Sequence, residues 1–126
     1  MEKKCKEYGQ VLPKKNVIEI KHKYTGKVIK VVEAETLGNA NLRGADLRNA
    51  DLRCADLRYA DLRYANLRSA DLRYANLGNA NLGNADLRNA NLGNANLRGA
   101  KTRMCKVNFS SDEYEQAKQF IEGLKL

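Results

Sequence analysis

The sequence has little of what a membrane protein or an ordinary globular domain needs. Among its 126 residues there is no tryptophan and only one proline, and leucine, isoleucine, valine and phenylalanine together make up about 22% of the chain. A core of the usual thickness is therefore disfavoured. No apolar run approaches the roughly 20 residues of a membrane-spanning helix, and Met1-Glu2-Lys3-Lys4 leads into no apolar signal segment. We expect one small domain that lies in the cytoplasm without a membrane partner.

Cysteine and histidine are also scarce. The three cysteines, Cys5, Cys54 and Cys105, form no Cys-x-x-Cys pair, so we expect free thiols in a reducing compartment rather than a zinc or redox site. One histidine, no Ser-His-Asp or Cys-His grouping and no glycine-rich phosphate loop leave no recognisable catalytic set. We therefore predict that the protein is not an enzyme, and that it has no catalytic residues, no metal site and no cofactor.

A leucine at every fifth position is the strongest pattern in the sequence. From Leu37 to Leu97, thirteen leucines follow one another at this interval, and the pattern continues imperfectly through Thr102 and Val107. Twelve of the thirteen have alanine two residues earlier, with asparagine or aspartate in between. The repeated unit is therefore Ala-(Asn/Asp)-Leu-x-x.

A period of five fits neither a regular helix nor a straight strand. Five residues of α-helix rotate by about 500°, so the leucines would line no single face. In a strand, an odd repeat would send alternate leucines to opposite faces. The pattern instead predicts a short extended piece, with alanine and leucine both inward, followed by a corner. Eight positions two residues after a leucine hold residues that tolerate such corners: Asn39, Gly44, Asn49, Asn79, Asn84, Asn89, Asn94 and Gly99.

These repeats resemble those of the pentapeptide-repeat proteins, whose motif has a central Leu or Phe, a small residue two positions before it and Asn or Asp directly before it. Ala45-Asp46-Leu47-Arg48-Asn49 is a near-ideal example, and the resemblance covers residues 35–109. It implies an all-β fold, a right-handed quadrilateral parallel β-helix with four repeats per coil and about 3.75 coils. Glu35 and Cys105 occupy the small inward position at the two ends, where the pattern weakens, so we expect flanking segments to cap the solenoid.

The flanking segments carry signals of their own. Residues 16–34 alternate in strand fashion around Tyr24-Thr25-Gly26-Lys27 and predict a β-hairpin cap, with His22 on the solvent edge of a strand. Residues 1–15 are polar, and we expect a partly disordered tail. Residues 110–126 begin with a Ser-x-x-Glu capping box and predict a C-terminal capping helix. Its apolar stripe either covers the last coil or forms a homodimer contact: Tyr114, Ala117, Phe120, Ile121 and Leu124.

Charge is distributed in a regular way along the repeats. Six aspartates have an arginine two residues later on the same outward face: Asp46/Arg48, Asp51/Arg53, Asp56/Arg58, Asp61/Arg63, Asp71/Arg73 and Asp86/Arg88. We interpret these as a ladder of solvated ion pairs rather than as a metal or acid–base array. Four arginines lack such a neighbour: Arg43, Arg68, Arg98 and Arg103. They account for most of the net positive charge of the repeats, in a chain whose net charge is +8.

One side of the coil is the candidate binding surface. If positions 20 apart share a face, the repeats centred on Leu42, Leu62, Leu82 and Thr102 form the most basic side. Cations lie there among corner tyrosines, as on surfaces that bind single-stranded nucleic acid or protein hot spots: Arg43, Tyr59, Arg63, Tyr64, Lys101 and Arg103. The alternative is that the tyrosines only shield coil edges, as Tyr74 on a different corner indicates.

Two function hypotheses follow from this sequence. The first is a non-enzymatic, rigid interaction or structural module whose partner is an unidentified protein or acidic macromolecule. The second is a binder of nucleic acid or another polyanion through the basic face of arginine and tyrosine. A third role, the DNA mimicry of the quinolone-resistance proteins of this family, is disfavoured because a DNA mimic presents negative charge to type II topoisomerases.

Overall fold

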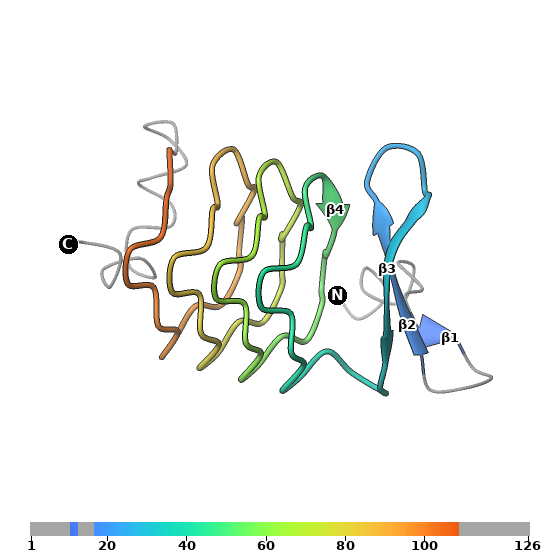
Figure 1. The fold of residues 1–126 in the computed structure, drawn as a ribbon, viewed down its shortest axis with the longest axis horizontal. Helices are drawn as coiled ribbons and strands as arrows, with labels where there is room; N and C mark the ends of the chain where they lie inside the picture. The colour runs from blue at the N-terminus through green and yellow to red at the C-terminus, as the bar shows by residue number, and fades with distance from the viewer. Residues whose placement is uncertain (1–10, 13–16, 109–126) are drawn as a thin grey trace.

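The computed structural model describes residues 11–12 and 17–108, which form a solenoid with a hairpin at one end (Figure 1). The named strands are β1 (Val11–Leu12), β2 (Val17–His22), β3 (Val28–Glu33) and β4 (Ala50–Asp51). In this part of the chain there is no helix that is long and apolar enough to cross a membrane. The predicted C-terminal helix, with its stripe of Tyr114, Ala117, Phe120, Ile121 and Leu124, lies outside the described residues.

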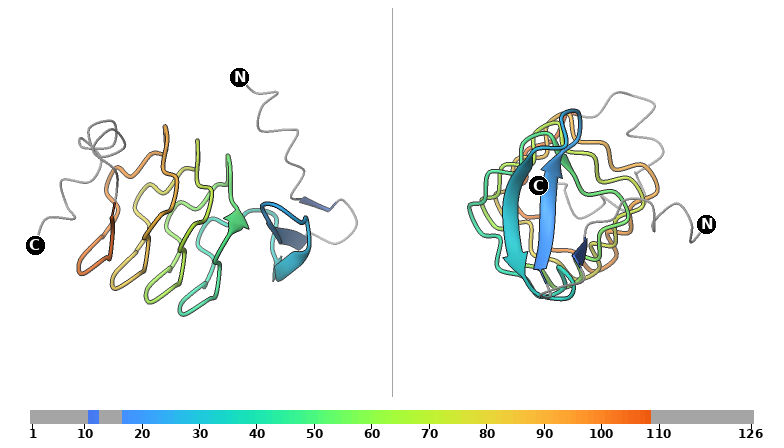
Figure 2. Two further views of the ribbon diagram at one scale, coloured as in Figure 1. Left: turned by 90° about the horizontal axis from the view of Figure 1, so that it is seen from above. Right: turned by 90° about the vertical axis from the view of Figure 1, so that its right-hand side faces the viewer.

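The repeats pair with one another in a fixed register. Ten parallel bridges each join residues 20 positions apart, such as Asn41 with Asp61 and Asp61 with Asn81. Main-chain hydrogen bonds follow the same register, since the Asp61 N–H donates to the carbonyl of Ala40 at 2.8 Å. Four repeats therefore complete one turn. We call residues 35–54, 55–74, 75–94 and 95–108 the first to fourth coils; they stack along one axis (Figures 1 and 2).

Each coil has four sides, and residues 20 positions apart lie on the same side. Side I carries the repeats centred on Leu37, Leu57, Leu77 and Leu97. Side II carries those centred on Leu42, Leu62, Leu82 and Thr102. Side III carries those centred on Leu47, Leu67, Leu87 and Val107, and side IV those centred on Leu52, Leu72 and Leu92.

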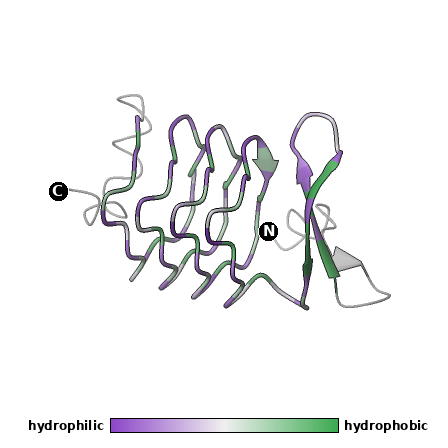
Figure 3. Ribbon diagram, viewed as in Figure 1, coloured by the Kyte–Doolittle hydropathy of each residue, from purple (hydrophilic) through white to green (hydrophobic). Residues whose placement is uncertain are grey.

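The core is a column of leucines beside a column of alanines. The thirteen leucines from Leu37 to Leu97 are at most 6% exposed, and the alanines from Ala50 to Ala95 at most 8%. This confirms the prediction that both residues of the repeat face inward. Glu35, which the pattern assigned to an inward position, is exposed instead, because a carboxylate is not buried without a partner. Hydrophobic and hydrophilic residues alternate along every coil (Figure 3).

The corners share one backbone conformation. All fourteen corner positions from Asn39 to Met104 have positive φ, between 58° and 75°. At each corner the leucine-position carbonyl accepts a hydrogen bond from the residue three positions later, as between Ala45 N–H and Leu42 at 3.0 Å. This confirms the eight predicted corners. Six further corners hold residues that the sequence analysis did not assign to a left-handed conformation: Cys54, Tyr59, Tyr64, Ser69, Tyr74 and Met104.

The N-terminal segment forms an antiparallel hairpin. Strands β2 and β3 pair with Ile18 opposite Val32. Gly26, with φ of 75°, lies in the connecting turn, which the His22 N–H closes by donating to the carbonyl of Lys27 at 2.8 Å. Strand β1 pairs with the other edge of β2, so residues 11–12 form a strand within the segment for which a partly disordered tail was expected.

The hairpin joins the solenoid through both main chain and core. Strand β2 pairs antiparallel with β4, with Lys21 opposite Asp51. Ile18 and Ile20 are buried and belong to the same cluster as the leucines. The hairpin therefore lies across one end of the coils, as the end-on view shows (Figure 2). Burial of two isoleucines covers apolar surface that an open first coil would leave to water.

Candidate functional site

The residue before each leucine closes a turn of the main chain. Its side-chain oxygen accepts the N–H two residues later, as between Arg48 and Asp46 at 3.3 Å and between Gly78 and Asn76 at 3.0 Å. Thr36 does the same for Gly38. The sequence analysis missed this role, although the restriction of this position to Asn, Asp and Thr before the leucines was the available signal. Asn and Asp interchange because both carry the required oxygen.

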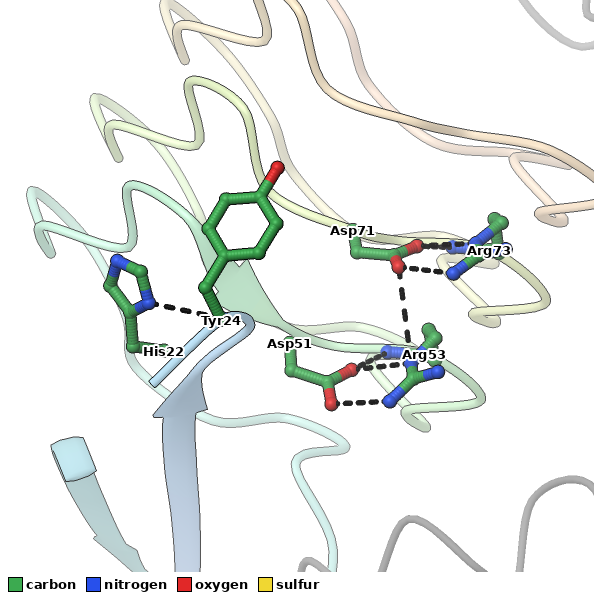
Figure 4. A network of polar contacts seen from close by, with 6 residues as sticks. All are labelled: His22, Tyr24, Asp51, Arg53, Asp71 and Arg73. Atoms are coloured by element: carbon green, nitrogen blue, oxygen red, sulfur yellow. Dashed lines mark hydrogen bonds and ion pairs between the residues drawn. The ribbon is translucent and has the colours of Figure 1, made fainter. Parts of the chain in front are cut away.

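The six predicted Asp/Arg pairs are present as bidentate forks. In each pair the Nε and Nη2 groups of the arginine donate to the two carboxylate oxygens at 2.6–2.9 Å. Figure 4 shows two such forks on side IV, in adjacent coils, with Arg53 Nε also 3.9 Å from an oxygen of Asp71. A bidentate fork fixes the plane of the guanidinium group, so the guanidinium groups of these six arginines have a fixed orientation on the surface of the coil.

Two of the forks lower the pKa of their aspartates strongly. The hydrogen bond from Arg63 lowers the pKa of Asp61 to about 2, and Arg43 adds a smaller electrostatic contribution. Arg88 lowers the pKa of Asp86 to about 2 in the same way, with a contribution from Arg68. Carboxylates with such pKa values do not serve as acids or bases at neutral pH.

Two arginines without a partner in their own repeat therefore lie near an aspartate of the next coil. The sequence analysis grouped Arg43 and Arg68 with Arg98 and Arg103 as lacking an acidic neighbour. The register of 20 residues separates them, because it sets Arg43 in the coil before Asp61 and Arg68 in the coil before Asp86. The five-residue period alone could not show which of these arginines lie near an aspartate of the next coil, because that depends on which repeats are stacked.

Side II places four of its six predicted site residues in the first two coils. The guanidinium of Arg43 lies 5.4 Å from the ring centroid of Tyr64. Arg63 forks with Asp61 and is half-buried. Tyr59 stands at the other corner of side II. Tyr59 is 61% exposed and Tyr64 56% exposed.

Lys101 and Arg103 belong to the same side but lie two coils further along. Both are exposed, and Met104 at the adjoining corner is 54% exposed. Between them and the tyrosines, Gly83 of the third coil leaves an open hollow that Asn81, Lys101 and Arg103 help to line. The stem of Arg63 borders Gly83, since its Cγ would lie 3.7 Å from a Cβ at that glycine. Side II thus has cations at both ends and a hollow at Gly83 between them.

Reactive groups elsewhere are held in unreactive forms. The Cys105 thiol is buried and donates to the carbonyl of Leu82 at 2.9 Å, and burial raises the pKa of the thiol to about 11. His22 Nδ1 accepts a hydrogen bond from the N–H of Tyr24 (Figure 4) and another from the N–H of Thr25. Over residues 17–108 no group of three or more His, Cys, Asp or Glu side chains is arranged to hold a metal ion. These side chains stabilise the fold.

The cysteines differ from the sequence-based expectation. Cys105 is free, but Cys54 is disulfide-bonded, so the prediction of three free thiols is wrong for Cys54. The remaining cysteine, Cys5, lies outside the described residues. The argument from free thiols to a reducing compartment therefore no longer holds. Spacing could not have given this result, because the pairing of cysteines depends on the fold.

The repeats match the model of a known protein family. The profile of pentapeptide repeats matches in eight copies over residues 36–68 and 65–101. Among solved structures, the chain is similar to a pentapeptide repeat protein from the thylakoid lumen of Arabidopsis thaliana, with 24% identity, a TM-score of 0.41, and 68% of this chain and 75% of that chain covered. It is also similar to a pentapeptide repeat protein from Nostoc PCC 7120, with 39% identity, a TM-score of 0.22, and coverage of 58% and 75%. No curated protein matches it.

Proposed function

Because the chain belongs to the family of pentapeptide repeat proteins, which fold as right-handed β-helices, we propose that it is a non-enzymatic, rigid binding module whose side II meets a macromolecular partner. Proteins of this family are generally structural or interaction modules rather than enzymes. A solenoid suits such a role because its coils hold outward side chains at fixed spacings. The binding residues would be Arg43, Tyr59, Arg63, Tyr64, Lys101 and Arg103.

The observation that carries this proposal is the backbone at the two corner tyrosines. Tyr59 and Tyr64 have φ of 62° and 64°, a left-handed conformation that costs a residue with a Cβ about 1–2 kcal/mol. Eight other corners hold asparagine or glycine, which adopt it more readily. Exposed tyrosines at such positions reduce stability without filling the core. A binding role explains why they are kept there, because exposed tyrosine is well suited to interfaces.

The proposal is tested by site-specific photo-cross-linking in native lysate. A photoreactive phenylalanine analogue replaces Tyr59 in one protein and Asn94, an exposed residue on the corner between sides IV and I, in the other. We expect discrete adducts from position 59 only. An excess of the unmodified chain should abolish them, whereas an excess of the Tyr59→Asn/Tyr64→Asn variant should not. Equal labelling at both positions, or competition by both proteins, would exclude side II as the binding surface.

The charge on side II supports an acidic partner over DNA mimicry. Three cations of this side have no aspartate in their own repeat, Arg43, Lys101 and Arg103, and the one aspartate of the side, Asp61, is forked by Arg63. A DNA mimic must present negative charge to its target. The homodimer contact suggested for the C-terminal helix involves residues outside the described part of the chain, and it stays a prediction.

A further inference from the structure

The fourth coil carries positive charge that nothing near it in the repeats balances. Residues 95–108 contain four cations, Arg98, Lys101, Arg103 and Lys106, and no aspartate or glutamate. All four are exposed. Among the described residues none of them takes part in an ion pair. Within the part of the chain that the structure describes, their charges are therefore unpaired, unlike those of the six forked arginines.

These cations surround three adjacent sides of the coil. Arg98 lies on side I, Lys101 and Arg103 on side II, and Lys106 on side III. The register continues through them, since Lys101 pairs with Asn81 and Lys106 with Asp86. Side II lies in the middle of this group, so its fourth-coil end has the highest density of unbalanced positive charge.

Side II connects this cationic end to the corner tyrosines. The second and fourth coils are two ladder spacings apart, or about 10 Å. The hollow at Gly83 lies between them and is lined by polar groups of Asn81 and by Lys101 and Arg103. Along the solenoid axis, a ligand would therefore meet the exposed rings and then a hollow that unbalanced cations help to line.

We propose that the partner of side II is a single-stranded nucleic acid, whose phosphates contact the fourth-coil cations and whose bases stack on Tyr59 and Tyr64. This inference rests on the binding role proposed above for side II. Cations attract any polyanion, but exposed rings between cations favour a strand with unpaired bases, because the bases of a duplex are already stacked on one another. An acidic protein would use the cations without needing ring faces at the corners.

The first measurement is the salt dependence of binding. Fluorescence anisotropy of a labelled single-stranded oligouridylate, and of its DNA counterpart, is followed with the full chain between about 50 and 200 mM salt. Four phosphate contacts predict a slope of log affinity against log salt of about −2.8, at about −0.7 per contact with a single strand. No binding at about 50 mM salt overturns the inference.

Matched charge variants locate the contacts. Lys101→Gln/Arg103→Gln removes two cations from side II, and Lys23→Gln/Lys27→Gln removes two from the hairpin at the other end of the solenoid. The first should make the slope shallower by about 1.4, whereas the second should leave it almost unchanged. Equal changes in the two variants would mean that net charge, and not the fourth coil, determines binding.

Matched aromatic variants separate stacking from charge. Tyr59→Asn/Tyr64→Asn places at both corners a residue that the backbone favours, so the fold is kept, and circular dichroism and thermal unfolding verify this. Loss of two stacking contacts should weaken binding about tenfold or more without changing the salt slope. The control Tyr24→Asn removes a tyrosine that is 78% exposed on the hairpin and should have little effect.

Competition with unlabelled polyanions shows which kind of polyanion the protein binds. Duplex DNA, heparin and polyphosphate should each displace the labelled strand much less effectively than unlabelled single strand at equal charge. Equal competition by heparin or by duplex, or a tyrosine variant that binds as well as the wild type, overturns the inference. If Tyr59 cross-links persist in nuclease-treated lysate while oligonucleotides do not bind, the binding role of side II stands and its partner is a protein.

Discussion

The second and fourth coils follow the same repeat but differ in outward charge. Their inward residues differ as well, since the second coil has leucine at all four central positions and the fourth has Leu97, Thr102 and Val107. In the second coil Arg58, Arg63 and Arg73 are each forked by the aspartate of their own repeat. In the fourth coil the position before the central residue holds Asn96 or Lys101, so no carboxylate is present to fork Arg98 or Arg103. Arginine therefore has two roles in this solenoid. In the second coil it forms ion pairs that fix side chains on the surface, and in the fourth coil its charge has no ion-pair partner among the described residues.

This difference shows which outward residues belong to the fold. A forked arginine also borders the next coil, since the stems of Arg58, Arg63 and Arg73 pass 3.5–3.7 Å from where a Cβ would be on Gly78, Gly83 and Gly93. Glycine in the third coil accommodates these stems. Arginines that are forked and packed in this way contribute to coil stacking, whereas those of the fourth coil have no such partners among the described residues.

The largest effect should come from the leucine column. Leu67→Ala in the second coil removes a fully buried side chain and should lower the free energy of unfolding by about 3 kcal/mol. Leu97→Ala in the fourth coil should cost less, because that site can relax more easily at the end of the stack. Urea unfolding of the two variants measures the difference. An equal or larger loss for Leu97→Ala would mean that the fourth coil is as rigidly held as the second.

A smaller effect of opposite sign should come from the corner tyrosines. Tyr59→Asn and Tyr64→Asn should each raise the free energy of unfolding by about 0.5–1 kcal/mol, since asparagine adopts positive φ more readily. The reverse change Asn79→Tyr, on the same corner column as Tyr59, should lower it by a similar amount. Thermal unfolding provides the measurement. Destabilisation by Tyr59→Asn would mean that the ring packs against the fold and would remove the argument for a binding role.

The smallest effect at neutral pH should come from the forks, which act mainly in acid. The pKa of Asp86 is about 2 in the fold and 3.8 without it, so the fork stabilises the folded state above about pH 4 and loses this contribution as pH falls towards 2. Asp86→Asn/Arg88→Gly gives this repeat the combination found at Asn81 and Gly83. It should leave the free energy of unfolding at pH 7 nearly unchanged and should reduce the fall in that free energy between pH 7 and pH 3. The control Lys101→Gln/Arg103→Gln removes no carboxylate. It should therefore not reduce the fall in the free energy of unfolding that protonation of the forked aspartates causes. Unfolding curves at pH 7 and pH 3 distinguish the two, and unchanged acid sensitivity in the first variant would contradict the role of the fork.

The inward positions of the repeat could be predicted from the sequence, whereas the conformations and contacts of the outward residues could be predicted only in part. Leucine and alanine two residues apart had to share a face, and Asn39 or Gly44 marked a corner by residue type. Positive φ at Tyr59 or Cys54 could not be read from residue type, because there the stacked ladder on both sides imposes the turn. The effect of Arg43 on Asp61 and the disulfide at Cys54 depend on which segments the fold brings together, which a period of five does not state.

The contrast between the two coils is tested most directly by hydrogen exchange at the arginine Nε–H groups, followed by ¹H–¹⁵N NMR at neutral pH. A bidentate fork occupies the Nε–H of Arg48, Arg53, Arg58, Arg63, Arg73 and Arg88, and these six should exchange slowly. Arg98 and Arg103 should exchange at the rate of a free guanidinium. Uniform exchange across all these arginines, or protection of Arg98 and Arg103 equal to that of the six, would contradict the division between fold-bound and free charge.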